Sequence, residues 1–408
     1  SVDSIGFHLD SFKADSSIFL NSEIKDLKGS FGITRDQIDL REMYLKYGET
    51  EINSDINLSL TSGNWIDFKR DSLFVDIMMS PAVIETKNFN QHEYLKNNRR
   101  ISLELQMKGY LNDLQITSLS GKLKTGSMFN ACGRINGMFG IDSALLTLEF
   151  IDSYWVQEDL KSYLREYNYG PLRFAGSIQG NKGEILISGE IINQLGNIDL
   201  EISLMNLLSF KKIQYHGKVD FDSFHLGKII NDSRVGRSVG SLIFEGSGSD
   251  TQTMNSNLFV QLEDVIFSNK TYQNVDIVLD KQSNNYKFSF NANDKDLKMR
   301  GQGVYIHQKT PQLEAEVALS YANLKALNFS KDSLVFCLNS KISISDFQES
   351  DLIGTVILDD VQILNKEKNI IFDPIYISLD TTKFNRIKIK NSIINMSASG
   401  DFPLYSVI

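Results

Sequence analysis

Proline is scarce in this chain: there are five prolines in 408 residues, against about 5% of residues in an average protein. Because proline cannot donate a main-chain hydrogen bond, its scarcity favours long runs of regular hydrogen-bonded backbone.

Cysteine is scarcer still, and Cys132 and Cys337 stand far apart with no second cysteine close to either. This spacing argues against a disulfide framework and against a cysteine zinc site.

Long apolar runs and an excess of positive charge are also missing. No run approaches the roughly 18 to 20 apolar residues that a transmembrane helix needs, and the chain does not open with a signal-like basic and apolar segment. We therefore expect any membrane anchor to lie outside this segment.

The chain has 42 Lys and Arg residues and 51 Asp and Glu residues, which makes its net charge −9. Without a basic stripe, nucleic acid is not an expected partner.

Apolar and polar residues alternate along most of the chain. Side chains of a strand point to opposite faces in turn, so this period of two predicts strands rather than helices. The alternation predicts roughly two dozen strands and a mainly β, mostly antiparallel protein. The clearest segments are 51–60, 101–107, 198–204, 258–262, 275–279, 286–290, 313–319, 338–344, 375–379 and 387–390.

Helical spacing is rare by comparison. The best candidate is 153–168, where Trp155, Leu160 and Tyr163 belong to an apolar stripe that ends before Gly170. Shorter candidate helices are 88–97, 224–231 and 321–327. None is long enough to cover a large sheet.

The shortage of helices leaves the apolar face of the sheet without an obvious cover. At about 4.8 Å per strand, two dozen strands would extend on the order of 110 Å, so the sheet must break into sandwiches or fold along its length. No linker, low-complexity segment or charge block marks a break. We expect one continuous elongated unit with three segments: 1–98, 99–210 with a helix near 153–168, and 211–408.

Catalytic and metal-binding patterns are weak. Residues 236–240 fit the G-x-S-x-G pattern around Ser238, but a nucleophile elbow leads from a strand into a helix. Here the candidate helix 224–231 comes first and a strand-like segment follows. The five histidines include no pair at metal-ligand spacing. We expect no enzyme activity, no metal and no cofactor.

Ten short segments between Gln214 and Leu404 follow one another in a recognisable order. They are 215–217, 224–230, 239–240, 244–248, 272–277, 293–297, 322–328, 352–356, 391–392 and 399–402. Taken together, these segments resemble the TamB branch of the AsmA-like proteins of Gram-negative envelopes, in its Bacteroidetes form. The similarity covers about half of the chain, and residues 1–210 share only the general strand-like pattern of the family.

The resemblance implies an elongated sheet curled into a trough, the β-taco, with an apolar interior. Such proteins are anchored in the inner membrane, cross the periplasm and work with an Omp85-type partner in the outer membrane. They conduct phospholipid between the membranes, support outer-membrane protein assembly, or do both. On this view the chain is an interior segment, and both the anchor and the contacts with the Omp85-type partner lie outside it.

A lipid-filled trough would also explain what covers the apolar face of the sheet, because acyl chains would take the place of a helix layer. Two alternatives stay open. One is a β-rich scaffold or adhesin with a closed, dry core that binds a protein partner, and the other is a chaperone that offers its sheet edge to nascent strands. The residues expected to line the trough are Leu258, Val260, Leu262, Val275, Ile277, Leu279, Tyr286, Phe288, Phe290, Leu313, Ala315, Val317 and Leu319.

Overall fold

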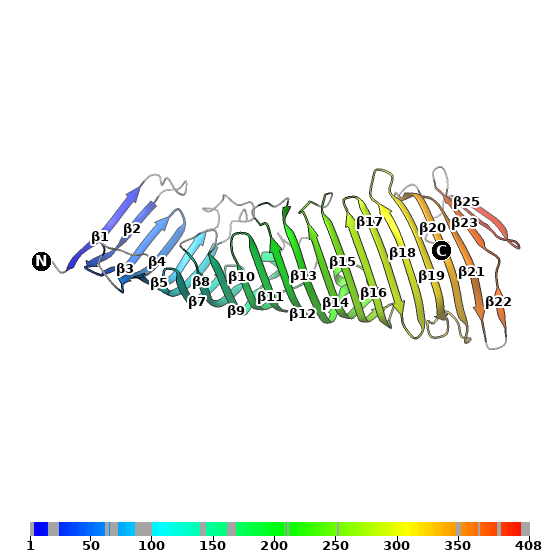
Figure 1. Ribbon diagram of the computed structural model, residues 1–408, viewed down its shortest axis with the longest axis horizontal. Helices are drawn as coiled ribbons and strands as arrows, with labels where there is room; N and C mark the ends of the chain where they lie inside the picture. The colour runs from blue at the N-terminus through cyan, green and yellow to red at the C-terminus, as the bar shows by residue number, and fades with distance from the viewer. Residues whose placement is uncertain are drawn as a thin grey trace. The chain divides into compact units, whose positions relative to one another are not determined.

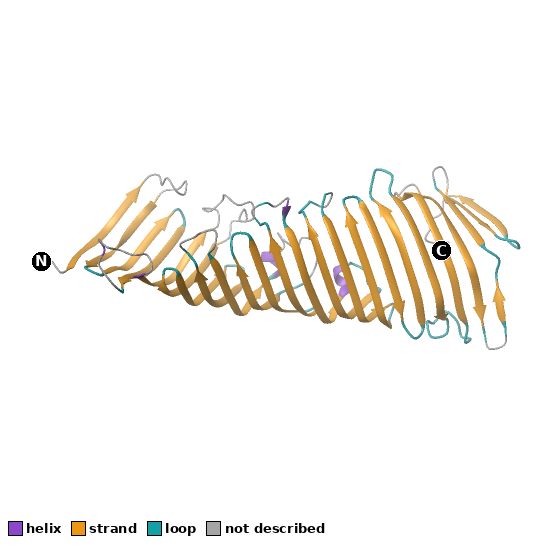
Figure 2. Cartoon of the chain, in the orientation of Figure 1, coloured by secondary structure: helices purple, strands orange, loops and turns teal. Residues whose placement is uncertain are grey.

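Strands make up most of the protein (Figure 2). The computed structural model divides into two compact units, Ser1–Leu208 and Ser209–Ile408, and each is described by itself. The expected segment boundaries after residues 98 and 210 lie outside the described residues. The structure describes residues 4–14, 24–61, 65, 72–85, 100–138, 144–160, 169–207, 209, 212–250, 253–347, 352–365, 368–381 and 385–400.

The first unit is an antiparallel sheet in which each strand pairs with the next one along the chain, from β1 to β12 (Figure 1). Its strands are β1 (Ser4–Ala14), β2 (Ile24–Thr34), β3 (Gln37–Tyr47), β4 (Thr50–Leu60), β5 (Leu73–Glu85), β6 (Arg100–Tyr110), β7 (Asp113–Leu123), β8 (Met128–Asn136), β9 (Leu145–Trp155), β10 (Leu172–Gly180), β11 (Glu184–Asn193) and β12 (Gly196–Met205).

The second unit continues the same pattern from β13 to β21. There β21 pairs with both β22 and β23, and β24 and β25 follow. Its strands are β13 (Gln214–His225), β14 (Val235–Ser247), β15 (Asn255–Phe267), β16 (Lys270–Gln282), β17 (Asn285–Asn293), β18 (Leu297–Ile306), β19 (Gln312–Asn323), β20 (Val335–Phe347), β21 (Leu352–Leu364), β22 (Asn369–Ile371), β23 (Ile375–Asp380), β24 (Asn385–Lys390) and β25 (Asn395–Gly400).

The predicted mainly β, antiparallel fold is confirmed, and each of the ten clearest predicted segments lies within a strand. Tight turns join many of the strands, as at residues 283–284 between β16 and β17. Two-residue connections of this kind require antiparallel neighbours. Neither unit closes on itself within the described residues, because β1 does not pair with β12 and β13 does not pair with β25.

The helix predicted at 153–168 is wrong at its start. Tyr154 and Trp155 belong to β9, where they pair with Arg173 and Leu172 of β10. Among the described residues, the helix α1 spans Gln157–Leu160, and the rest of the predicted helix, 161–168, lies outside the described part of the chain. Pairing on both sides of β9 therefore outweighs the helical spacing of the apolar side chains.

The shorter helix predictions fare differently. The prediction at 224–231 is confirmed for α2 (Leu226–Ile229), although its first residues end strand β13. The prediction at 321–327 is wrong, because β19 runs to Asn323 and hydrogen-bonded turns follow it. The predicted helix 88–97 lies outside the described residues.

A buried carboxylate holds α1 against the sheet. The Asp159 side chain is 4% exposed and accepts hydrogen bonds from the hydroxyls of Thr125 and Ser127. Ser127 Oγ in turn accepts a hydrogen bond of 2.9 Å from the main-chain N–H of Val156. Because a buried carboxylate is stable only when its oxygens are satisfied, these donors explain why an acidic residue sits at this position.

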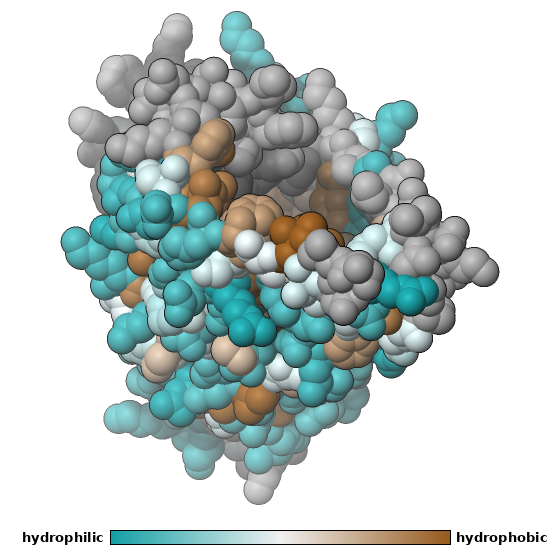
Figure 3. All heavy atoms as spheres, turned by 90° about the vertical axis from the view of Figure 1, so that its left-hand side faces the viewer, coloured by the Kyte–Doolittle hydropathy of each residue, from teal (hydrophilic) through white to brown (hydrophobic). Residues whose placement is uncertain are grey.

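Part of the first unit has a closed apolar core. Leu60, Leu73, Val75 and Leu114 are buried together, and Trp65 packs against them with other partly buried apolar residues. Viewed from the end at which β1 lies, several apolar side chains lie together among hydrophilic ones (Figure 3). The cluster shows that this sheet can bury an apolar face against its own chain.

We predict that Gly133→Ala destabilises the first unit by about 2 kcal/mol. A methyl group on Gly133 would collide with the carbonyl oxygen of Thr147 on β9, which is backbone and cannot turn away. Gly32→Ala is the matched control, since its methyl group would lie 3.7 Å from Asp39 Cβ, an ordinary contact. Urea unfolding followed by circular dichroism should give a lower midpoint for the first variant alone. Equal midpoints would contradict the close strand approach at Gly133.

Candidate functional site

The residues expected to line a trough lie on one face of the second unit. Residues directly opposite each other in an antiparallel pair project to the same side of the sheet. Leu279 of β16 lies opposite both Leu258 of β15 and Phe288 of β17. Ile277 likewise lies opposite Val260 and Phe290.

The same rows continue across β18 and β19. Phe288 lies opposite Gly303, which lies opposite Ala315. Phe290, Gly301 and Val317 form the next row in the same way, and Tyr286, Tyr305 and Leu313 form another. The two remaining predicted positions follow: Val275 is opposite Leu262, and Leu319 is opposite Met299. We call the side of the sheet that bears all thirteen predicted residues the apolar face.

The apolar face is wider than the sequence analysis proposed. The central row extends into further strands on both sides of β15–β19, and alternation in the segments 338–344, 375–379 and 387–390 was the signal for part of it. The additional residues are Phe244 in β14, Ile342 in β20, Val356 in β21, Ile377 in β23, Ile389 in β24 and Met396 in β25.

The described residues cover this face only in part. Of the thirteen predicted residues, Leu262 and Ala315 are buried, and Ile277 is 37% exposed. The other ten, including Phe288 and Phe290, are half-buried. The partly exposed apolar side chains of this face form a continuous band, which we call the apolar strip. Such a strip is a feature of binding surfaces rather than of closed cores.

Glycines let two aromatic rings lie flat on the apolar face. The Phe288 ring rests on Gly303, where a Cβ atom would lie 2.5 Å from its Cζ, and the Phe290 ring rests on Gly301 in the same manner. Larger residues at 301 and 303 would force both rings to stand up. The two glycines therefore allow the side chains of the apolar strip to lie close to the backbone of β18.

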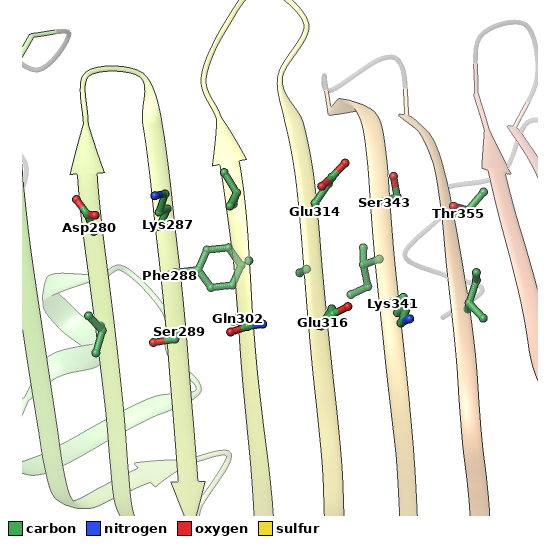
Figure 4. Close-up of a pocket in the computed structure, with 16 residues that line it drawn as sticks. Asp280, Lys287, Phe288, Ser289, Gln302, Glu314, Glu316, Lys341, Ser343 and Thr355 are labelled. Atoms are coloured by element: carbon green, nitrogen blue, oxygen red, sulfur yellow. The ribbon is translucent and has the colours of Figure 1, made fainter.

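The opposite side of β16–β21 carries charged and polar side chains around a shallow groove (Figure 4). One hollow of about 570 Å³ has Asp280 opposite Lys287 and Glu316 opposite Lys341. Neither of these two charge pairs closes to an ion pair in the described structure. We call this side the polar face. Sequence reasoning missed the groove, because its lining comes from six strands spread over about eighty residues.

Charged groups close one end of the apolar strip. At the hairpin of β15 and β16, Lys270 Nζ lies 3.2 Å from Asp296 Oδ2 and donates a hydrogen bond to the Ala326 carbonyl. Asp294 is 2% exposed and accepts the main-chain N–H groups of Gln273 and Asp296. Burial and these two carboxylates raise the pKa of Tyr272. At this end, therefore, Lys270 is neutralised by Asp296, and Asp294 is stabilised by main-chain donors.

The serine of the G-x-S-x-G pattern lies in the middle of a strand. Residues 236–240 belong to β14, and Ser238 is 1% exposed. The segment thus lacks the sharp strand-to-helix turn that would expose a nucleophile. No cluster of three or more His, Cys, Asp or Glu residues that could hold a metal ion occurs within the described residues.

Comparison with known proteins gives no relative: no family model, no curated protein and no solved structure matches the chain. Among the described residues, no helix combines the length and apolar character needed to cross a membrane. The resemblance to the TamB branch therefore stays a prediction, and the geometry of the two faces carries the functional argument.

We predict that Ile277→Lys lowers the binding of an environment-sensitive apolar dye by about twofold or more, because it places a charge in the apolar strip. Val278→Lys is the matched control: its side chain is 42% exposed, against 37% for Ile277, and alternation directs it to the polar face. Dye fluorescence with the purified, delipidated protein is the measurement. An equal loss in both variants would contradict the separation of the faces.

Proposed function

We propose that the protein is a non-catalytic lipid carrier whose apolar face holds the acyl chains of phospholipid. The observation that carries the proposal is the in-phase apolar row from Phe244 to Met396, in which most side chains are half-buried and Met396 is 50% exposed. Apolar area that protein does not cover is available to lipid, and each buried CH₂ group contributes about 0.8 kcal/mol.

The resemblance from Gln214 to Leu404 adds the biological setting to this proposal. In that setting the protein works in the periplasm of a Gram-negative bacterium as part of an inner-membrane-anchored protein. It conducts phospholipid between inner and outer membrane, supports outer-membrane protein assembly with an Omp85-type partner, or does both.

A scaffold or adhesin with a dry core is the second candidate. The buried cluster of Leu60, Leu73, Val75 and Leu114 favours it, because there the sheet covers its apolar side chains with its own residues. The two candidates differ in what covers Phe288: acyl chains in the first, and protein in the second.

Photo-crosslinking in cells separates the two candidates. We expect a photoreactive residue at Phe288 to yield a phospholipid adduct, because this position lies in the central row of the apolar face. The same residue at Ser289, whose side chain alternation directs to the polar face, opposite Val278, should yield none. Mass spectrometry of the adducts is the readout. Adducts at Phe288 that join only parts of this chain would favour the dry core.

A further inference from the structure

A row of five polar residues and one glycine borders the apolar strip at the end opposite Lys270. The row crosses six strands, with each member directly opposite the next: Tyr215, Gly246, Ser256, Lys281, Tyr286 and Tyr305. Lys281 and Tyr286 each stand two residues from the strip residues Leu279 and Phe288, on the same face. We call these six residues the Lys281 row.

Lys281 is a nearly buried cation without a counter-charge. It is 6% exposed, and its ammonium donates to two neutral carbonyls, at 3.3 Å to Met254 O and 2.5 Å to Ser283 O. Its Nζ also lies 5.0 Å from the centre of the Tyr286 ring. No described carboxylate forms an ion pair with it. An ammonium has three protons to donate, so one donor has no hydrogen-bond partner among the described residues, and no described carboxylate neutralises the charge.

Hydroxyl groups without partners occur in the same row. Tyr215 Oη is shielded from solvent, has no hydrogen-bond partner within the described chain, and lies over Gly246. The hydroxyls of Ser256 and Tyr286 likewise make no hydrogen bond with described residues. Buried polar groups are normally satisfied, so the shielded Tyr215 hydroxyl and the nearly buried, unneutralised Lys281 in the same row point to an anionic ligand. The Ser256 and Tyr286 hydroxyls, which are open to solvent, are further donors that such a ligand could use.

The two ends of the strip differ in this respect. At the far end Asp296 neutralises Lys270, whereas Lys281 has no such carboxylate. Residues two apart on one face of a strand are separated by roughly 7 Å. An oxyanion at Lys281 would therefore sit about one side chain away from acyl chains that lie along the row of Leu279 and Phe288.

We propose that the Lys281 row binds the phosphoryl headgroup of a lipid whose acyl chains lie on the apolar face. The proposal rests on the lipid-carrying function proposed above. Lys281 supplies the charge and a hydrogen bond, the Tyr286 and Ser256 hydroxyls add neutral donors, and Tyr305 extends the aromatic border, with its ring centre 5.8 Å from that of Tyr286.

The test compares two lipids that differ only in the phosphate. Purified, delipidated protein is incubated with vesicles that contain phosphatidic acid and diacylglycerol with identical acyl chains, and the lipid taken up is identified by mass spectrometry. We expect about a tenfold preference for phosphatidic acid, the size expected for one charge-assisted hydrogen bond.

The variants assign this preference to the row. Lys281→Met keeps the apolar stem and removes the ammonium, so the preference should fall close to one while diacylglycerol uptake stays. Tyr286→Phe should lower the preference by a smaller factor, and it provides an independent test if the first variant does not fold by circular dichroism. Lys298→Met, at an exposed lysine at the start of β18, makes the same charge change and should leave the preference intact.

Each contrary outcome has a distinct meaning. Equal uptake of both lipids by the parent protein overturns the headgroup site and leaves the lipid carrier standing. Uptake of neither lipid overturns the carrier and, with it, this inference. Binding of inorganic phosphate that depends on Lys281, together with equal uptake of both lipids, would assign the site to a free anion rather than to a lipid.

Discussion

The fold and its proposed function both depend on cross-strand register. In an antiparallel ladder, directly opposed residues project to the same side of the sheet, and a slip of one residue would move an entire set of side chains to the other face. The pairs β15–β16, β16–β17 and β17–β18 run without a register shift. Elsewhere in the second unit the shifts lie mostly near strand ends, as between Phe221 and Phe224. The apolar rows therefore stay in phase across many strands.

Constant register gives the two sides of the second unit different chemistry. The apolar face carries half-buried rings and aliphatic chains, which Gly301 and Gly303 keep low at β18. The polar face carries opposed charges around a groove. The two ends of the apolar strip differ as well, since Lys270 has a carboxylate partner and Lys281 has only carbonyl oxygens. Together these differences define an amphipathic sheet, and they are the basis of the proposed lipid binding.

Predictions from the sequence failed where local spacing competed with strand pairing. Tyr154 and Trp155 fit a helical stripe, yet both are paired in β9. Residues 321–323 complete β19 for the same reason. The spacing of apolar residues in a short segment is compatible with both a helix and a strand. Pairing with a neighbouring strand decides which of the two forms. The strand that pairs with a given segment lies elsewhere in the sequence, beyond a turn or a longer connection. The spacing within the segment therefore cannot reveal that pairing.

The sequence by itself determined the strands, their antiparallel order and the members of the apolar face from Leu258 to Leu319, because alternation is a local property that each strand carries alone. Only the tertiary structure decided how the rows align, which charges meet and which stay without a partner. Asp296 reaches Lys270 from the turn between β17 and β18, whereas Lys281 meets two main-chain oxygens and the Tyr286 ring but no described carboxylate. Such contacts depend on side chains from several strands meeting at one point, and periodicity carries no information about that.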